Sequence, residues 1–326
     1  MRKITAAIIM LLAVTVTVVA IQTPKNPKKK PVSVKSDSTA ILLEQARSGD
    51  AAAQNTVGTW YYAGHDSIPQ DYREALKWWA RSAQQGNADA IGNMAVCYQL
   101  GRGTERDSAK AMGLYEAAIK KGNASIIPQH EEIVKNTKSI FSSLLLNKCY
   151  TQGLGVKRNQ DKATEYLTIA AESGHEASQF SLALFYLNAQ QPAMAVPWLK
   201  KAVAQNNTGA IYHYGNLLFK GQGITQDKQE GMQYIQLAAS QGFATANARL
   251  GQIYYDGDGM PQDYAKAVSH LKQAVARNNV NAKWLLANCY LEGRGVAQDY
   301  YFATQWFAEV AMLTYTNQFN DLLTKD

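Results

Sequence analysis

Residues 244–279 read ATANARLGQIYYDGDGMPQDYAKAVSHLKQAVARNN, and this stretch decides the fold because it recurs along the chain. Segments 88–123 and 208–243 have the same length and align with it without gaps, while 280–313 and 51–87 follow it with small changes in length. A period of this size is typical of repeat arrays in which each block is a helix pair. The chain is therefore predicted to be all-α.

Each block opens with a helix whose buried face can be recognised from the spacing of its residues. Its reference point is a small residue, found at Ala53, Ala90, Ser142, Ser178, Ala210, Ala246 and Ala282. An apolar residue follows four positions later, and an aromatic ring follows eight positions later in six of the seven blocks. These spacings place the side chains on one face of an α-helix.

A turn and a second helix complete the block. The turn carries glycine pairs at Gly101/Gly103, Gly153/Gly155, Gly221/Gly223, Gly257/Gly259 and Gly293/Gly295. Glycine after a helix adopts the left-handed conformation that ends it. An aspartate then begins the second helix, where its carboxylate is expected to cap free N–H groups, at Asp71, Asp107, Asp227, Asp263 and Asp299.

The pattern Ala246, Leu250-Gly251, Tyr254, Gly257-Asp258-Gly259, Asp263, Ala267, Ala274 resembles the Sel1-like repeat family, a relative of the tetratricopeptide repeats. The resemblance covers roughly residues 39–313. It implies an α-solenoid, a right-handed superhelix of antiparallel helix pairs, within a repeat domain at 39–326. Seven repeats are expected near 51–87, 88–123, 124–175, 176–207, 208–243, 244–279 and 280–313.

Three segments depart from the regular block. Repeat three carries 16 extra residues near 126–141, which we expect to lengthen its first helix and which are either a contact for a partner or simply a longer helix. Repeat four (176–207) lacks the glycine turn. Residues 39–49 are expected to form a capping helix whose Leu42, Leu43 and Ala46 cover repeat one, because solenoids need closed ends.

The N-terminus has the pattern of an export segment. Arg2 and Lys3 precede an uncharged apolar run at 4–21, so residues 1–21 are either a signal peptide cleaved near Ala20 or a membrane anchor. Residues 22–38 form a linker rich in proline and lysine. The protein is expected to be exported to the periplasm or cell envelope, either soluble or tethered to the membrane through residues 4–21.

The net charge of +7 at first favours nucleic acid as a partner. Residues 1–35, however, hold seven basic residues and no acidic one, so the remaining chain sums to zero (7 − 7). A neutral body has no broad field that attracts phosphates. Nucleic acid is therefore not an expected partner.

The three cysteines, Cys97, Cys149 and Cys289, occupy the same position in different repeats. Packed helices separate equivalent positions by roughly 8–10 Å, beyond the about 7 Å limit for a disulfide. We expect all three to be small core residues. A cysteine-rich branch of the family, some of whose members act on β-lactams, has a disulfide within each repeat; this chain lacks such pairs.

No arrangement typical of an active site is visible. The five histidines fall at five different repeat positions, and neither a Gly-x-Ser-x-Gly nor a His-Glu-x-x-His motif occurs. Trp78, Trp198 and Trp306 share one repeat position and are expected to pack in the core. We therefore expect no catalytic residue, cofactor or metal.

A partner surface is predicted where the first helices line a concave face. Its proposed residues are Tyr62, Tyr212, Asn216, Phe219, Gln252, Tyr255, Trp284, Asn288 and Leu291. Amides can bond an extended peptide backbone, and exposed aromatic rings provide apolar anchors. The alternative is that the amides are tolerated on a wetted surface and the aromatic rings pack between repeats.

The function predicted is a protein-interaction scaffold that binds a peptide or protein of the cell envelope. Two alternatives remain open: an enzyme acting on cell-wall material or β-lactams, and a structural oligomeriser whose edge helix docks on a second copy.

Overall fold

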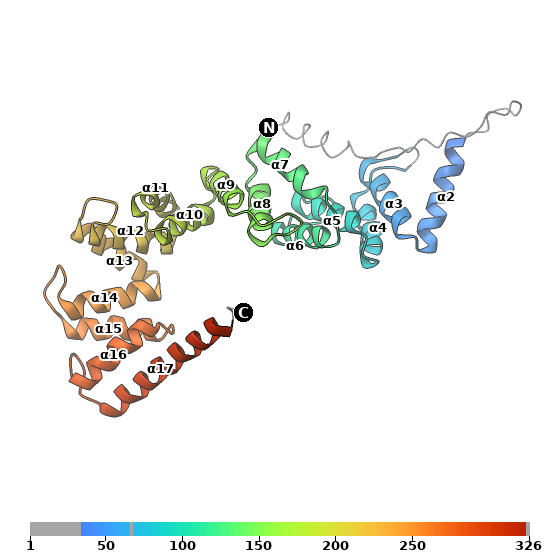
Figure 1. Ribbon diagram of the computed structural model, residues 1–326. Coiled ribbons are helices and arrows are strands. Elements are labelled where there is room, and N and C mark those ends of the chain that lie inside the picture. Colours follow the sequence, from blue (N-terminus) through green and yellow to red (C-terminus); the bar gives the residue numbers. More distant parts are fainter. Residues whose placement is uncertain (1–33, 66–67, 324–326) are drawn as a thin grey trace, which may run out of the picture. The chain divides into compact units, whose positions relative to one another are not determined.

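The computed structural model describes residues 34–65 and 68–323, with the side chains of 38–65 and 68–312. In those residues the regular secondary structure is helical, and the remaining pairing is one isolated bridge between His65 and Ile68. The prediction of an all-α solenoid is confirmed (Figure 1). The export segment at 1–21 and most of the linker at 22–38 lie outside the described residues.

The helices form one pair per repeat, and the two members of a pair pack on each other. In repeat order the pairs are α3 (Ala51–Ala63) with α4 (Tyr72–Gln84), α5 (Ala88–Leu100) with α6 (Ser108–Lys120), α8 (Ile140–Gln152) with α9 (Gln160–Glu172), α10 (Glu176–Asn188) with α11 (Pro192–Ala204), α12 (Thr208–Lys220) with α13 (Lys228–Ser240), α14 (Ala244–Asp256) with α15 (Tyr264–Val275), and α16 (Val280–Glu292) with α17 (Tyr300–Leu323).

The chain divides into two compact units, residues 1–173 and 174–326. The first contains α2 (Val34–Ser48) to α9, and the second contains α10 to α17. Within each unit the small reference residues are buried, as expected from their position between packed helices: Ala53, Ala90, Ser142, Ser178, Ala210, Ala246 and Ala282. Within each unit, apolar clusters join neighbouring helix pairs.

The ends of the helices follow the predicted chemistry. Asp263 accepts the N–H of Lys266 at 2.9 Å and so caps α15, and the four other predicted aspartates cap their helices in the same way. The first glycine of each pair ends its helix in the left-handed region, with φ 72° at Gly293. Burial of Ala46, with Leu42 and Leu43 packed beside it, confirms the cap on repeat one.

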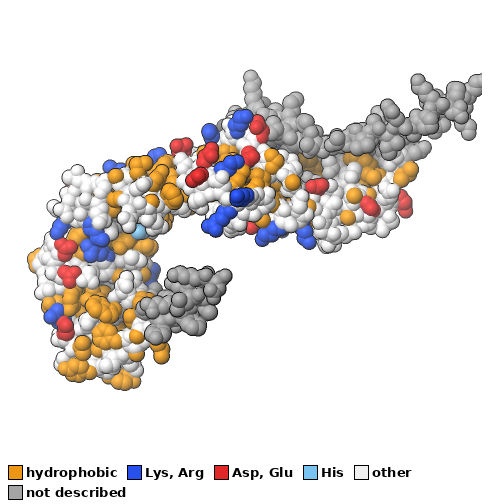
Figure 2. Space-filling model, in the orientation of Figure 1, with side chains coloured by type: hydrophobic (Ala, Val, Ile, Leu, Met, Phe, Trp, Pro, Cys, Tyr) orange, Lys and Arg blue, Asp and Glu red, His pale blue; other side chains and the backbone are white. Residues whose placement is uncertain are grey.

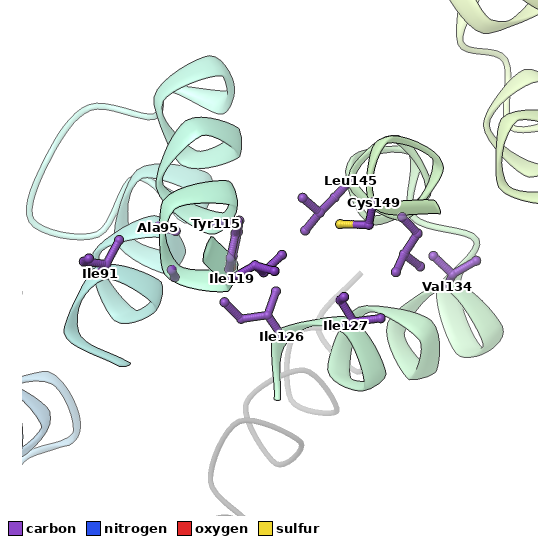
Figure 3. Packing of buried hydrophobic residues seen from close by; sticks show 11 residues of the cluster. Ile91, Ala95, Tyr115, Ile119, Ile126, Ile127, Val134, Leu145 and Cys149 are labelled. Atoms are coloured by element: carbon purple, nitrogen blue, oxygen red, sulfur yellow. The ribbon is translucent and has the colours of Figure 1, made fainter. Parts of the chain in front are cut away.

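The insertion in repeat three does not lengthen the first helix, and that prediction is wrong. It forms a separate helix, α7 (Ile126–Thr137), which ends at Lys138 in the left-handed region (φ 53°). Ser139 then caps α8. In Figure 3, Ile126 and Ile127 of α7 point toward the space between Ile119 of α6 and the residues Leu145 and Cys149 of α8. Burial of these side chains in one cluster holds the insertion in place.

The cysteine and tryptophan predictions are confirmed. Cys97, Cys149 and Cys289 are free thiols with no exposed surface. Burial raises the pKa of Cys97 to about 12 and of the other two to about 11, so the thiolate form is disfavoured at neutral pH. Trp78, Trp198 and Trp306 pack, partly buried, against the apolar clusters.

Candidate functional site

The predicted partner surface follows one stripe on the first helices of the second unit. Trp284, Asn288 and Leu291 are spaced by four and three residues on α16, and Gln252 and Tyr255 occupy the matching positions on α14. Residues at these spacings share a helix face. Because α14 contacts α16 directly, the stripes of repeats six and seven adjoin.

The two aromatic residues that α12 contributes to the predicted partner surface are buried. Tyr212 is 9% exposed, with its ring 5.3 Å from that of Phe243, and Phe219 is 2% exposed beneath the guanidinium of Arg249. Both rings fill the core between repeats five and six. The prediction that Tyr212 and Phe219 face a partner is corrected, because the next repeat already covers them.

The three amides of the predicted partner surface, Asn216, Gln252 and Asn288, are not a row of free hydrogen-bonding groups. Gln252 Nε2 donates to Asp256 Oδ2 at 2.6 Å, and Asn288 Nδ2 donates to the Trp284 carbonyl at 3.0 Å. Asn216 Oδ1 is buried and has no hydrogen-bond partner among the described residues. Each amide therefore has a different environment, and two already use a donor within their own helix.

Tyr255 is held by an arginine of the next repeat. Arg294, in the glycine turn of repeat seven, donates to Tyr255 Oη at 2.7 Å, and its guanidinium lies 5.4 Å from the ring centres of Tyr255 and Tyr264. Burial and then Glu292 raise the pKa of Tyr255, while Arg294 acts in the opposite direction. The side chain thus keeps a partly exposed ring edge while its hydroxyl is neutral and bound.

Tyr62, the predicted site residue of the first unit, has the same surroundings. Arg102 donates to its hydroxyl and lies over the rings of Tyr62 and Tyr72, at 5.2 and 5.4 Å. We call this arrangement, an arginine lying over two tyrosines of the preceding repeat, the arginine clamp. It was not predicted from the sequence. Its signal was present, since Gly-Arg-Gly occurs in repeats two and seven, where the preceding repeat has tyrosine at both clamp positions.

The open part of the stripe lies on α16. Trp284 is 52% exposed, at the position that Tyr212 occupies, buried, in repeat five. Asn288 and Leu291 are partly exposed on the same face, next to Gln252 and Tyr255 of α14. Figure 2 shows hydrophobic side chains gathered over this C-terminal end of the described chain. An exposed tryptophan with amides beside it can anchor an apolar side chain and bond a peptide backbone.

The described part of the chain holds no group of three or more His, Cys, Asp or Glu side chains placed to bind a metal ion. Among the same residues, no helix combines the length and apolar character needed to cross a membrane.

The chain is similar in sequence to proteins from bacteria and yeast, one of them with a solved structure. The chain is 26% identical to a Sel1 repeat protein from Oxalobacter formigenes, with a TM-score of 0.52 over 89% of this chain and 80% of the other. It is 22% identical to the Sel1-repeat-containing protein YjcO of Escherichia coli, over 64% of this chain and 87% of that protein. It is 27% identical to the chitin synthase regulator SKT5 of Saccharomyces cerevisiae, over 63% of this chain but only 28% of the yeast protein.

The family model described as Sel1 repeat matches seven segments, 51–87, 88–123, 148–175, 177–207, 208–243, 244–279 and 280–315. The third match begins after α7, which is consistent with an insertion at the start of that repeat. These matches cover well over half of the sequence, and the chain therefore belongs to the Sel1 repeat family.

Proposed function

We propose that this chain is an exported, non-catalytic adaptor that holds a peptide or protein segment of the cell envelope. Proteins of the Sel1 repeat family generally mediate protein–protein interactions, which supports the class of function. The observation that locates the binding surface is the exposure of Trp284. This ring is more than half exposed, whereas Tyr212 and Phe219 on the same face in repeat five are buried.

The binding surface comprises Trp284, Asn288 and Leu291 of α16 with Gln252 and Tyr255 of α14. Trp284 supplies the apolar anchor, because an aromatic side chain that becomes fully buried dominates the affinity of many interfaces. Gln252 and Asn288 retain carbonyl oxygens that can accept backbone N–H groups of the bound segment. The surface presents no charged residue at these five positions, so it suits a non-acidic, partly apolar segment.

Site-specific photo-crosslinking in intact cells tests the proposal. A crosslinker at position 288, beside the intact Trp284, is expected to yield a discrete adduct, identifiable by mass spectrometry, that is lost when the same protein also carries Trp284→Ala or Leu291→Ala. A crosslinker at Leu237, which is also exposed but lies on the second helix α13, is the matched control. Equal adducts at both positions, or unchanged capture by Trp284→Ala with native circular dichroism, would contradict the proposal.

Export is tested separately by sequencing the N-terminus of the protein recovered from cell fractions. A chain beginning after Ala20 in the periplasmic fraction indicates a cleaved signal peptide, and an intact chain in the membrane fraction indicates an anchor. Recovery of the intact chain from the cytoplasm would contradict export.

Self-association is the second candidate function. It is favoured by α17, on which Tyr300, Tyr301, Phe302 and Met312 are exposed. Light scattering during size-exclusion chromatography distinguishes it, because a monomer at all concentrations excludes it.

A further inference from the structure

A hollow of about 580 Å³ lies in the first unit, at the turn from α7 to α8. The end of α5, the glycine turn of repeat two and the end of α9 form its other walls. Its size is that of a small-ligand site. The insertion builds part of the wall through Lys138 and Ser139, so the regular repeat does not contain this hollow.

The charged side chains that line the hollow are both cationic, Arg106 and Lys138. Both are exposed, and neither forms an ion pair with any described residue. Leu100, Ile140 and Phe141 add apolar surface. The first turn of α8 also faces the hollow, and the N-terminal end of a helix favours negative charge.

Arg106 stands where the repeat normally places a structural glutamine. In four other repeats the side chain at this position donates to the carbonyl of the first helix nine residues after the reference residue, at 2.6–3.1 Å: Gln70 to Tyr62, Gln226 to Phe219, Gln262 to Tyr255 and Gln298 to Leu291. Arg106 makes no such bond in the described structure and instead lines the hollow. Repeat three also has an arginine at this position, Arg158, so what distinguishes Arg106 is that it lines the hollow beside Lys138.

We propose that this hollow binds an anionic ligand in which a carboxylate lies next to an apolar group, as in the last residue of a peptide with a hydrophobic side chain. Arg106 and Lys138 hold the carboxylate, with Arg106 able to bond both oxygens. Leu100, Ile140 and Phe141 receive the apolar group. The site is independent of the α14–α16 surface, which lies in the other unit.

The test measures binding of three probes to the full chain by fluorescence anisotropy and by competition. The probes are a labelled hexapeptide ending in Leu-Phe with a free carboxylate, the same peptide with a C-terminal amide, and unlabelled decanoate as competitor. The free-acid peptide is expected to bind, the amide to bind at least about tenfold more weakly, and added salt to weaken binding of the acid. Displacement by decanoate shows that a carboxylate on an apolar chain is enough for binding. Lack of displacement shows that the ligand is a peptide C-terminus.

The variants use the repeat as its own control. Arg106→Gln installs the residue that four other repeats have, so the fold is expected to persist while affinity for the acid falls about tenfold or more. Lys138→Asn removes the positive charge and introduces a residue that tolerates the left-handed backbone at this position, and it is expected to weaken binding as well. Arg158→Gln removes the equivalent arginine of repeat three, which does not line the hollow, and is expected to bind as the unaltered protein does. Equal binding of acid and amide, equal loss in Arg106→Gln and Arg158→Gln, or no saturable binding of any probe would overturn the proposal.

Discussion

The two glycines of the turn perform different tasks in repeats two, five and seven. Gly293 ends α16, and the atoms nearest to a Cβ there would be those of Gln298, at 3.4 Å or more. A Cβ on Gly295 would lie 2.3 Å from the carbonyl oxygen of Tyr264, in the preceding repeat. Gly103 and Gly223 approach backbone atoms of the preceding repeat just as closely. In these three turns the second glycine is therefore required for contact between repeats as well as for backbone conformation, whereas a Cβ on Gly259 would first meet the Lys228 side chain, at 3.2 Å.

Gly295→Ala is expected to destabilise the protein more than Gly293→Ala. The latter forces a left-handed alanine, at a cost of about 1–2 kcal/mol, whereas the former adds a collision with backbone that cannot rotate away. Urea unfolding monitored by circular dichroism measures the difference. Gly113→Ala, inside α6 with open space around it, is the control and is expected to be neutral or stabilising. Equal losses for the two turn variants would contradict the division of tasks.

His130 is expected to make the stability of the first unit depend on pH. It is 3% exposed, its Nδ1 lies 2.9 Å from Ser142 Oγ, and Tyr115 packs edge-on against its ring. Burial lowers its pKa from 6.5 to about 4. As the pH falls below 6.5, the unfolded chain takes up a proton on this residue while the folded chain does not. The stability that the buried, uncharged imidazole of His130 contributes is therefore full above pH 6.5 and is lost as the pH falls toward 4.

Between pH 6.5 and about 4, the shifted pKa of His130 is expected to lower the free energy of unfolding by roughly 3 kcal/mol. His130→Gln, whose amide can still reach Ser142, is expected to flatten the pH dependence of the unfolding midpoint. Burial also lowers the pKa of His213 and His270, so a smaller dependence remains. His65→Gln is the control. An unchanged slope in His130→Gln would show that the acid sensitivity arises elsewhere.

At the scale of helices, three junctions between neighbouring repeats use the same two positions: the residue between the two turn glycines and the first residue of the second helix in the preceding repeat. Arg102 and Arg294 each insert over two tyrosines of the preceding repeat. Between repeats five and six the turn instead carries Asp258, and Lys228 begins the second helix; these two form an ion pair at 2.8 Å. A cation therefore bridges the junction in each case, although it comes from opposite sides.

Arg102→Gln is expected to lower the free energy of unfolding by about 1 kcal/mol, because the cation–ring contacts with Tyr62 and Tyr72 are lost at a partly exposed site. The urea midpoint of the full chain measures it. Arg73→Gln, which removes an exposed arginine of α4, is the control for the change in net charge. A loss of the same size in Arg73→Gln would attribute the effect to charge rather than to the clamp.

At the scale of the whole molecule, a repeat contacts mainly its sequence neighbours, so damage is expected to remain local. Ala46→Glu places a carboxylate in the 1% exposed contact between the capping helix α2 and repeat one. Hydrogen exchange is expected to accelerate in α2 to α4 and to remain unchanged in α12 to α16. Gln45→Glu adds the same charge on the exposed side of α2 as a control. Faster exchange throughout the chain would show cooperativity beyond nearest neighbours.

The sequence by itself determined the helix pairs, their caps and the family. These follow from spacing and from side chains that act within a few residues, such as Asp263 on the N–H of Lys266 or Gly293 at the end of α16. The buried state of the three cysteines also followed, because equivalent positions in a repeat have equivalent surroundings.

Only the tertiary structure decided which residues of the first-helix stripe are open. Tyr212 and Trp284 occupy the same repeat position, yet one is 9% and the other 52% exposed. The exposure of a ring depends on what the neighbouring helices bring against it, and those helices are distant in sequence. The same reason explains α7 and its hollow: Ile126, Ile127 and Val134 have an amphipathic pattern that fits either a longer helix or a separate one, and packing against Ile119 and Leu145 selected the latter.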